Sequence, residues 1–242
     1  MEIAERIAYG ANENQYFELW RPRQASAGTA VMIHGGFWRA KYDLAHARPF
    51  CAALAARGML TANLEYRRVG QPGGGWPGTF EDVVAGIKAA TESLGDAPVV
   101  IGHSAGGHLA LLAATEGLPL RTVVALAPVA DLRRAYDLNL SNGAVREFLG
   151  TTPESDPGRY DLACPSRKAV SIPRLLVHGT EDEDVPTSIS RAFVAAHNDD
   201  PQPPKLIEIG GAKHMELIDP SSAPGAEVIE LVVQLAQAGS AR

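Results

Sequence analysis

The sequence predicts an α/β fold in which a mostly parallel central sheet of about eight strands is flanked by helices. Short, unbroken apolar runs recur along the chain, as is typical of strands that are buried on both faces of a parallel sheet. Segments with apolar residues at helical spacing stand between these runs, and glycine-rich turns follow several of them. The clearest apolar runs are 29–33, 97–101, 122–126 and 172–177. We therefore expect ligands to bind at the carboxyl ends of the strands.

The remaining elements follow from weaker signals of the same kind. Residues 6–9 and 15–20 flank a turn of glycine and asparagine, which predicts an edge hairpin. Two further strands are expected at 59–64 and 205–209. The helical spacing of apolar residues predicts helices at 44–57, 80–94, from 105 onward, 186–197 and 223–237.

A chain of 242 residues with 45% hydrophobic residues is long enough to bury one large core, so we expect one domain over residues 1–242. Residues 128–171 interrupt the alternation of strands and helices. Short helices are expected at 131–140 and 144–149, followed by a polar stretch at 151–159. An insertion here would lie above the strand ends, so it predicts a small cap that shapes specificity.

Charge and composition narrow the class of partner and the compartment. The net charge of −6 is spread without long runs of one sign, which argues against nucleic acid or an anionic membrane as the partner. Cys51 and Cys164 lack metal-ligand spacing, and no apolar run approaches about 18 residues. We expect a soluble, cytoplasmic protein with a small-molecule substrate and neither metal nor organic cofactor; the sequence leaves room for a homodimer.

Ser104 is the predicted nucleophile. It stands within the pattern Gly-x-Ser-x-Gly at 102–106, where an apolar strand passes directly into a helix. A single connecting residue must adopt a strained backbone conformation, and Gly102 and Gly106 relieve the crowding around it. Such a nucleophile elbow lifts the serine Oγ above the sheet. The alternative is that Ser104 only caps the helix.

The Gly-Gly pair that follows the strand at 29–33 is the predicted oxyanion hole. Attack on a carbonyl places negative charge on its oxygen, and preorganised backbone N–H groups stabilise that charge. One N–H is expected from Ala105 and the other from Gly36 or Phe37. The alternative is an ordinary turn, and His34 itself is expected to be a buried, hydrogen-bonded core residue.

Four acidic residues at 181–184 follow the strand at 172–177, and one of them could orient a histidine. Asp184 lies just before Pro186, where a helix dipole accounts for its charge. Glu181 and Glu183 have longer side chains that favour solvent. Asp182 is therefore the preferred acid, with Asp184 as the alternative.

His214 is the predicted general base, because it lies on a glycine-rich loop after the last strand and follows both the serine and the acid in the chain. The other six histidines lie on predicted helices or beside glycines at strand ends. Large apolar side chains near these loops are expected to line the substrate pocket, although packing within the core would explain them equally well. They are Trp38, Trp76, Phe148 and Met215.

The order serine, acid, histidine together with the elbow resembles the α/β-hydrolase superfamily over nearly the whole chain. Residues 34–38 (HGGFW) and 102–110 (GHSAGGHLA) look like the esterase branch of carboxylesterases, hormone-sensitive-lipase-like esterases and arylformamidases. Residues 178–186 (HGTEDEDVP) match the segment H-G-x-x-D-x-x-V-P of that branch and of the prolyl oligopeptidase family. This resemblance also selects Asp182 over Asp184.

The resemblance implies a serine hydrolase that cleaves small to medium carboxylic esters through an acyl-enzyme. Arylformamidase activity is the first alternative, since Trp38 in the segment 34–38 resembles the pattern of the arylformamidases. Peptidase or acyltransferase activity, and then a non-catalytic binding scaffold, are the further alternatives. Ester and amide substrates thus remain open at this point.

Overall fold

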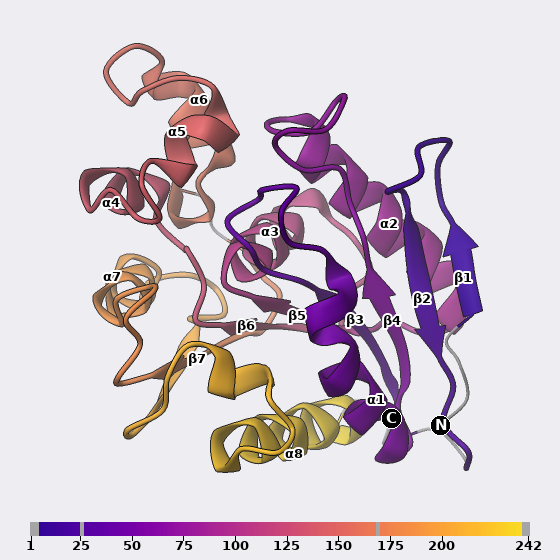
Figure 1. Ribbon diagram of the computed structural model, residues 1–242. Helices are drawn as coiled ribbons and strands as arrows, with labels where there is room; N and C mark the ends of the chain where they lie inside the picture. Colours follow the sequence, from indigo (N-terminus) through magenta and orange to yellow (C-terminus); the bar gives the residue numbers. More distant parts are fainter. Residues whose placement is uncertain (1–4, 25–26, 168–169, 239–242) are drawn as a thin grey trace.

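The computed structural model describes residues 5–24, 27–167 and 170–238 (Figure 1). Their eight strands form one sheet in the order β1-β2-β4-β3-β5-β6-β7-β8. β1 and β2 form the antiparallel hairpin at one edge, β2 pairs antiparallel with β4, and the remaining pairs are parallel. The predicted fold class is confirmed. The strands are β1 (Glu5–Ala8), β2 (Tyr16–Trp20), β3 (Thr29–Ile33), β4 (Leu60–Leu64), β5 (Val99–His103), β6 (Thr122–Leu126), β7 (Arg174–Gly179) and β8 (Lys205–Ile209).

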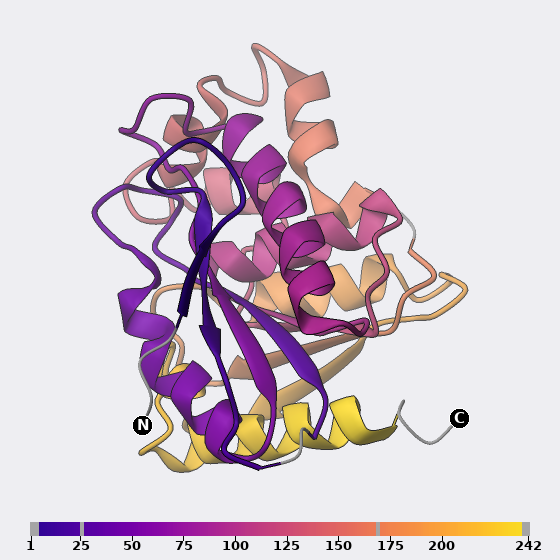
Figure 2. The same cartoon turned by 90° about the vertical axis from the view of Figure 1, so that its right-hand side faces the viewer.

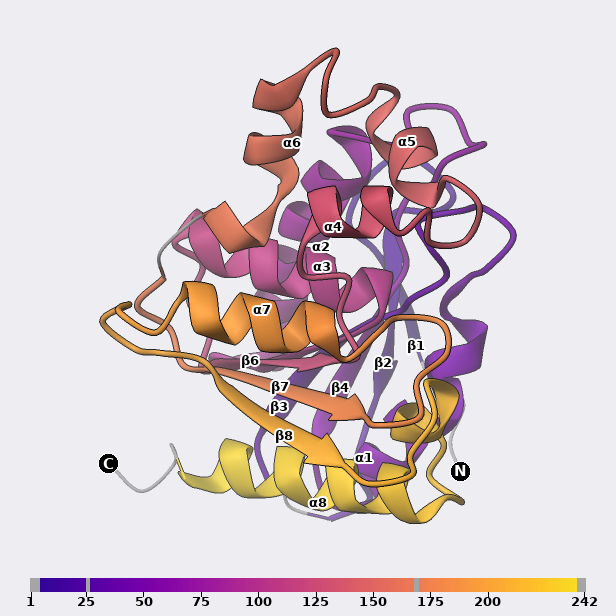
Figure 3. The same ribbon diagram turned by 90° about the vertical axis from the view of Figure 1, so that its left-hand side faces the viewer.

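Helices cover both faces of the sheet (Figures 1 and 3). α1 (Arg48–Ala56) and α8 (Ala223–Ala238) lie on one face, and Figure 2 shows α8, in yellow, running beneath the strands. α2 (Gly78–Leu94), α3 (Ala105–Ala113) and α7 (Ser188–Ala196) cover the other face. Every residue of β3, β5, β6 and β7 is buried, which explains why these segments are mostly apolar and do not alternate with polar residues.

Short 3-10 helices complete the chain. η1 (Leu44–Ala47) precedes α1, so the helix expected at 44–57 consists of two pieces. η2 (Ala114–Glu116) extends α3, and η4 (Met215–Ile218) follows directly after His214. None of the described helices combines the length and the apolar character that a membrane span requires.

The segment between β6 and β7 carries three helices beyond the strand ends, namely α4 (Leu132–Asp137), α5 (Ala144–Leu149) and α6 (Pro157–Ala163), followed by η3 (Pro165–Arg167) (Figure 3). Within the expected insertion at 128–171, residues 168–169 lie outside the described part. The sequence interpretation missed α6 because the stretch 151–159 is polar. The Asp156 side chain accepts a hydrogen bond from the Arg159 N–H at 3.0 Å, and Pro157 occupies the first turn, so the dipeptide Asp-Pro was the available signal.

The strand register brings the predicted nucleophile and the glycine-rich loop after β3 together. Ile33 pairs with Gly102 in the parallel ladder, so the segments that follow β3 and β5 leave the sheet side by side. Ser104 has φ 58° and ψ −119°, a backbone conformation that residues other than glycine rarely adopt. A Cβ at Gly106 would overlap the carbonyl oxygens of Ile33 and His34, and one at Gly102 would overlap the Gly106 carbonyl. Only glycine therefore allows this close approach of helix and strands.

Replacement of Gly106 with alanine is expected to lower the free energy of unfolding by about 2 kcal/mol or more, because the added methyl group meets backbone that cannot move aside independently. Gly158→Ala is the matched control, since its Cβ would meet its nearest neighbour, Asp156 Oδ1, at 3.7 Å. Urea-induced unfolding of both variants measures the difference. Equal stabilities would contradict the steric role assigned to Gly106.

Candidate active site

The elbow holds the backbone of Ser104 on both sides. Its N–H donates to the carbonyl of Leu126 at 2.8 Å, and its own carbonyl accepts from the N–H of His108 at 3.1 Å. Only 2% of the residue is exposed. The neighbouring strand and the first turn of α3 thus determine where the Ser104 hydroxyl lies.

Asp182 and His214 meet although 32 residues separate them in the chain. His214 Nδ1 lies 2.7 Å from Asp182 Oδ2. The other oxygen, Oδ1, accepts from the N–H groups of Asp184 at 2.9 Å and Val185 at 2.8 Å. Since a carboxylate only accepts hydrogen bonds, Nδ1 carries the hydrogen and Nε2 is left as the basic nitrogen. The contact is made by Asp182 and not by Asp184, the alternative from the sequence.

His178 is a further partner of Asp182, which sequence reasoning had not assigned to the site. Its Nε2 lies 2.8 Å from the Val185 carbonyl and 3.2 Å from Asp182 Oδ2, and its Nδ1 lies 2.8 Å from the Ser190 hydroxyl. Because the carbonyl of Val185 accepts, Nε2 carries a hydrogen that also faces the carboxylate. The position of His178 in the same motif as Asp182 was the signal that could have revealed this contact.

The Asp182 carboxyl is buried and ionised. Burial alone raises its pKa, but hydrogen bonds from His178 and His214 and from the Val185 N–H lower it, and the pKa lies well below its usual range. The side chain has no exposed surface. The negatively charged Asp182 carboxylate therefore contacts the His214 ring throughout the neutral pH range.

This lowered pKa predicts acid sensitivity. The group contributes stability that is complete above its unfolded pKa of about 3.9 and is lost as the pH falls through its lower folded value. The difference in free energy of unfolding between the wild type and Asp182→Asn should thus be smaller at pH 3 than at pH 7. Urea titrations at the two pH values measure it, and an unchanged difference would contradict the assignment.

A cavity of about 290 Å³ lies beside Ser104 and brings most of the predicted site residues together. Ser104 and His214 both line it, as do Gly36, Phe37 and Met215 from the predicted set. Residues that the sequence interpretation had not placed in the pocket complete the lining. They are Tyr42, His46, His103 and Asp184.

Two of these additional residues are histidines that stay neutral. Burial and the neighbouring His214 lower the pKa of His103 well below its usual range, and burial and His34 lower the pKa of His46 to about 4. The Nε2–H of His103 donates to the backbone carbonyl of His214 at 3.1 Å, and the two ring centroids are 4.5 Å apart. His103 thus holds the backbone of His214 without adding charge to the site.

The loop after β3 offers backbone donors to the cavity. Gly36 has φ 106° and Phe37 has φ 50°, so the chain turns sharply beside Ser104. Within the described part of the chain, neither N–H is seen to donate to a protein acceptor. Ala105 is the first residue of α3, and its N–H has no partner within the helix. These three N–H groups are the predicted oxyanion donors.

Three of the four predicted pocket side chains lie elsewhere. Trp38 is fully buried and stacks on Phe148, with ring centroids 4.5 Å apart. Trp76 stacks on Phe80, and its backbone N–H donates to the Phe148 carbonyl at 2.9 Å. These contacts join the loop at 70–78 and α5 to the core. The expectation that Trp38, Trp76 and Phe148 line the pocket is corrected accordingly, because Trp38 and Phe148 pack on each other, Trp76 packs on Phe80, and none of the three lines the cavity.

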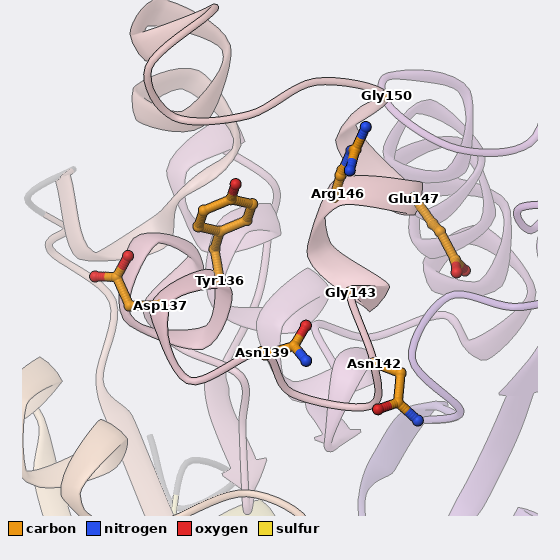
Figure 4. A pocket seen from close by; sticks show the side chains of 8 residues that line it. All are labelled: Tyr136, Asp137, Asn139, Asn142, Gly143, Arg146, Glu147 and Gly150. Carbon is orange, nitrogen blue, oxygen red and sulfur yellow. The ribbon is translucent and has the colours of Figure 1, made fainter.

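A larger and shallower depression of about 840 Å³ lies across α4, α5 and the loop between them (Figure 4). Arg39 follows the oxyanion loop, which consists of residues 35–38. It reaches the loop between α4 and α5 and donates to Ser141 Oγ at 2.9 Å, and it also donates to Glu147 of α5 at 2.7 Å. The depression is lined by Tyr136, Asp137, Asn139, Asn142, Gly143, Arg146, Glu147 and Gly150. None of the predicted catalytic residues is among them.

Asp182, Asp184 and His214 are also a group of potential metal ligands among the described residues, since one ligand atom of each lies within 4.8 Å of the others. A metal ion on these atoms would compete with the hydrogen bond between Asp182 and His214 Nδ1. The donor set fits an acid and histidine pair better than a metal centre. The expectation that no metal is needed stays a prediction.

Residues 18–196, more than half of the chain, match the BD-FAE family. The chain belongs to this family. BD-FAE membership agrees with the α/β-hydrolase resemblance inferred from the motifs around Ser104 and Asp182.

Individual relatives of this BD-FAE chain are named as esterases. It is 27% identical to esterase LipQ of Mycobacterium tuberculosis over an alignment of length 217, which covers 78% of the chain and 51% of LipQ. The chain thus spans about half the length of that relative. Among solved structures, inhibited esterase B of Lactobacillus rhamnosis superposes with a TM-score of 0.82 at 19% identity, covering 99% of this chain and 87% of that one. The acetyl ester-xyloside bifunctional hydrolase of Caldicellulosiruptor lactoaceticus superposes with a TM-score of 0.78 at 20% identity, covering 98% and 97%. Both likenesses confirm the α/β-hydrolase fold.

Proposed function

We propose that this protein is a serine hydrolase of carboxylic esters with short acyl groups. The observation that carries the proposal is the pairing of His214 Nδ1 with the Asp182 carboxylate while His214 and Ser104 line the same small cavity. An orienting acid, a basic imidazole and a hydroxyl on a strained elbow are the three parts that nucleophilic acyl transfer requires. The esterase names of LipQ and of the structural neighbours support the same reaction class.

In the proposed mechanism, His214 Nε2 takes the proton of the Ser104 hydroxyl as its Oγ attacks the ester carbonyl. Asp182 keeps the imidazole in the required tautomer and stabilises the imidazolium. His214 then returns the proton to the leaving alcohol, and the acyl group remains on Ser104. Water, activated by the same histidine, releases the acid and restores the hydroxyl.

The oxyanion of the tetrahedral intermediate would accept hydrogen bonds from the N–H of Ala105 and from that of Gly36 or Phe37. Such donors act most strongly when they are oriented before the reaction begins. The positive φ angles at Gly36 and Phe37 and the helical position of Ala105 support this role.

The size and lining of the cavity favour a short acyl chain. Its volume of about 290 Å³ is just below the range of about 300–1,000 Å³ for small-molecule sites. Phe37, Tyr42 and Met215 give it an apolar surface. Trp38, the residue that had suggested an arylformamidase, stacks within the core and does not line this cavity.

A panel of p-nitrophenyl acetate, butyrate and octanoate, together with N-formylkynurenine, tests this substrate class. We expect kcat/KM for the acetate or butyrate ester to exceed that for the octanoate ester by about tenfold or more, since additional methylenes find no room. Labelling by a fluorophosphonate should accompany the activity. Preferred cleavage of N-formylkynurenine would contradict the ester assignment, and absence of both labelling and turnover would indicate a non-catalytic scaffold.

We further propose that residues 1–242 act as one catalytic domain in which the segment 128–171 is a small cap over the site. Arg39 supports this, because it joins the oxyanion loop to Ser141 and Glu147 of that segment. Cys51 and Cys164 are both buried and free, which supports a reducing compartment such as the cytoplasm.

A further inference from the structure

A buried charged cluster lies directly behind the oxyanion loop, and the mechanism above does not use it. His34 follows β3 and has no exposed surface, and Glu65 follows the neighbouring strand β4 with 1% exposed. The two side chains are in contact, with His34 Nε2 2.9 Å from Glu65 Oε1. Burial of a charged pair costs free energy unless both groups are well hydrogen-bonded. The contacts of His34 and Glu65 therefore indicate what this pair does.

Glu65 is a carboxylate surrounded by donors. Its oxygens accept from the N–H groups of Tyr66 at 2.9 Å and Leu44 at 3.1 Å, and Arg68 Nη1 lies 3.2 Å from Oε1. Burial raises its pKa, but His34, Arg68 and the Tyr66 N–H outweigh this and hold the pKa below its usual range. The partner that faces His34 Nε2 therefore accepts a hydrogen bond and does not donate one.

The other ring nitrogen of His34 also faces an acceptor. His34 Nδ1 lies 2.8 Å from the backbone carbonyl oxygen of Gly35. A carbonyl and a carboxylate both accept, so both ring nitrogens carry hydrogens and the ring is an imidazolium. Tyr66 stacks on it with ring centroids 4.4 Å apart and donates its hydroxyl to the His34 carbonyl at 2.7 Å, and the neutral His46 ring stands edge-on at 5.6 Å.

The hydrogen bond to the Gly35 carbonyl determines the direction of the next N–H. A peptide unit is planar, and in the trans form its C=O and N–H point in opposite directions. The unit that contains the Gly35 carbonyl also contains the N–H of Gly36, one of the predicted oxyanion donors. Neither glycine has a side chain that would restrict rotation of this plane, so the His34 contact supplies the restraint.

We propose that His34 is a positioning residue of the oxyanion hole: as an imidazolium anchored by Glu65, it holds the Gly35–Gly36 peptide so that the Gly36 N–H is aimed at the cavity. The inference rests on the proposed function, because it matters only if an oxyanion forms there. It changes the expectation for His34 from a core residue to one that acts on catalysis through the backbone.

A matched pair of neutral variants separates the two contacts of the ring. In His34→Asn the amide nitrogen replaces Nδ1 and can still donate to the Gly35 carbonyl, whereas the contact with Glu65 is lost. In His34→Gln the amide nitrogen replaces Nε2 and can still donate to Glu65, whereas the Gly35 carbonyl loses its donor. Both variants lose the charge and the stacking on Tyr66.

The proposal predicts opposite orders of stability and activity. His34→Asn should be the less stable variant, because it leaves the buried Glu65 with one donor fewer. His34→Gln should have the lower kcat, by about tenfold or more relative to His34→Asn, with little difference in KM, because an oxyanion donor acts in the transition state. Its affinity for a trifluoromethyl ketone, which forms a tetrahedral adduct, should fall in the same proportion.

Tyr9→Phe is the control for destabilisation of this region, since Tyr9 donates to the backbone carbonyl of Glu65 at 2.7 Å and, among the described residues, has no hydrogen bond to His34 or to residues 35–38. It should lose stability with kcat within about twofold of the wild type. A purely structural role of His34 would make kcat follow stability in both variants, and this result would overturn the inference.

Nitrogen-15 NMR of the folded wild-type protein at pH 7 gives an answer that does not depend on the folding of any variant. Two ring N–H signals of His34 are expected, and a single one would overturn the inference. Fluorophosphonate labelling separates this failure from failure of the proposed function. A wild type that is labelled but shows only one ring N–H refutes the role of His34 alone, whereas a wild type that is neither labelled nor active refutes the esterase.

Discussion

Replacement of Ser104 with alanine should lower kcat for p-nitrophenyl acetate by about 10⁴-fold or more, because no other group in the proposed mechanism can form the acyl bond. The free energy of unfolding should change by less than about 1 kcal/mol. Alanine keeps the Cβ, and the backbone contacts of Ser104 to Leu126 and His108 involve no side-chain atom. The effect should therefore lie in catalysis and not in the fold.

Steady-state kinetics and fluorophosphonate labelling of the same preparation measure this effect. Ser93→Ala provides the control, since Ser93 is an exposed serine on α2 whose hydroxyl donates to the Ala89 carbonyl of its own helix. It should keep wild-type turnover. Labelling of Ser104→Ala at the wild-type rate would transfer the nucleophile to another residue.

Asp182→Asn has the second-largest expected effect, a loss of about 10³- to 10⁴-fold in kcat. An amide keeps the shape of the carboxyl group but carries no charge, so the imidazolium of His214 loses its stabilisation. The amide nitrogen can also donate to His214 Nδ1, which would move the ring hydrogen to Nε2, where the base is needed. Both consequences act on the transition state, so kcat should fall more than KM rises.

Neighbouring acids make this test specific. Glu183→Gln should keep wild-type activity, because Glu183 is exposed and does not line the cavity. Asp184→Asn should change kcat by less than about tenfold, since Asp184 lines the cavity but its backbone, not its carboxylate, contacts Asp182. A larger loss for Asp184→Asn than for Asp182→Asn would reverse the assignment of the acid.

Most of the fold and the three predicted catalytic residues could be inferred without coordinates, because their signals are local. A strand buried on both faces is apolar at most positions, as the sequences of the fully buried β3, β5, β6 and β7 show. The elbow needs glycine at 102 and 106 because backbone from elsewhere fills the space of a Cβ. Both requirements restrict the residue types within a few consecutive positions, so they can be recognised in the sequence.

The roles that sequence analysis predicted wrongly or did not find depend on contacts between residues that are far apart in the chain. Trp38 and Phe148 are 110 positions apart, and nothing in either neighbourhood shows that they stack on each other and not on a substrate. Tyr42 and His46 entered the cavity lining because the chain after Gly36 folds back over the site. His178 and His34 resemble ordinary residues at strand ends until their ring nitrogens are seen to face Asp182 and Gly35.

The sequence by itself determined the succession of strands and helices, the strained position of Ser104 and the choice of Asp182 and His214 as candidates, since each depends on backbone requirements or motifs within short stretches. Only the tertiary structure decided which aromatic rings face the cavity and which histidines support the site. Such roles depend on the directions in which side chains from distant strands point, and those directions are set by packing of the whole sheet.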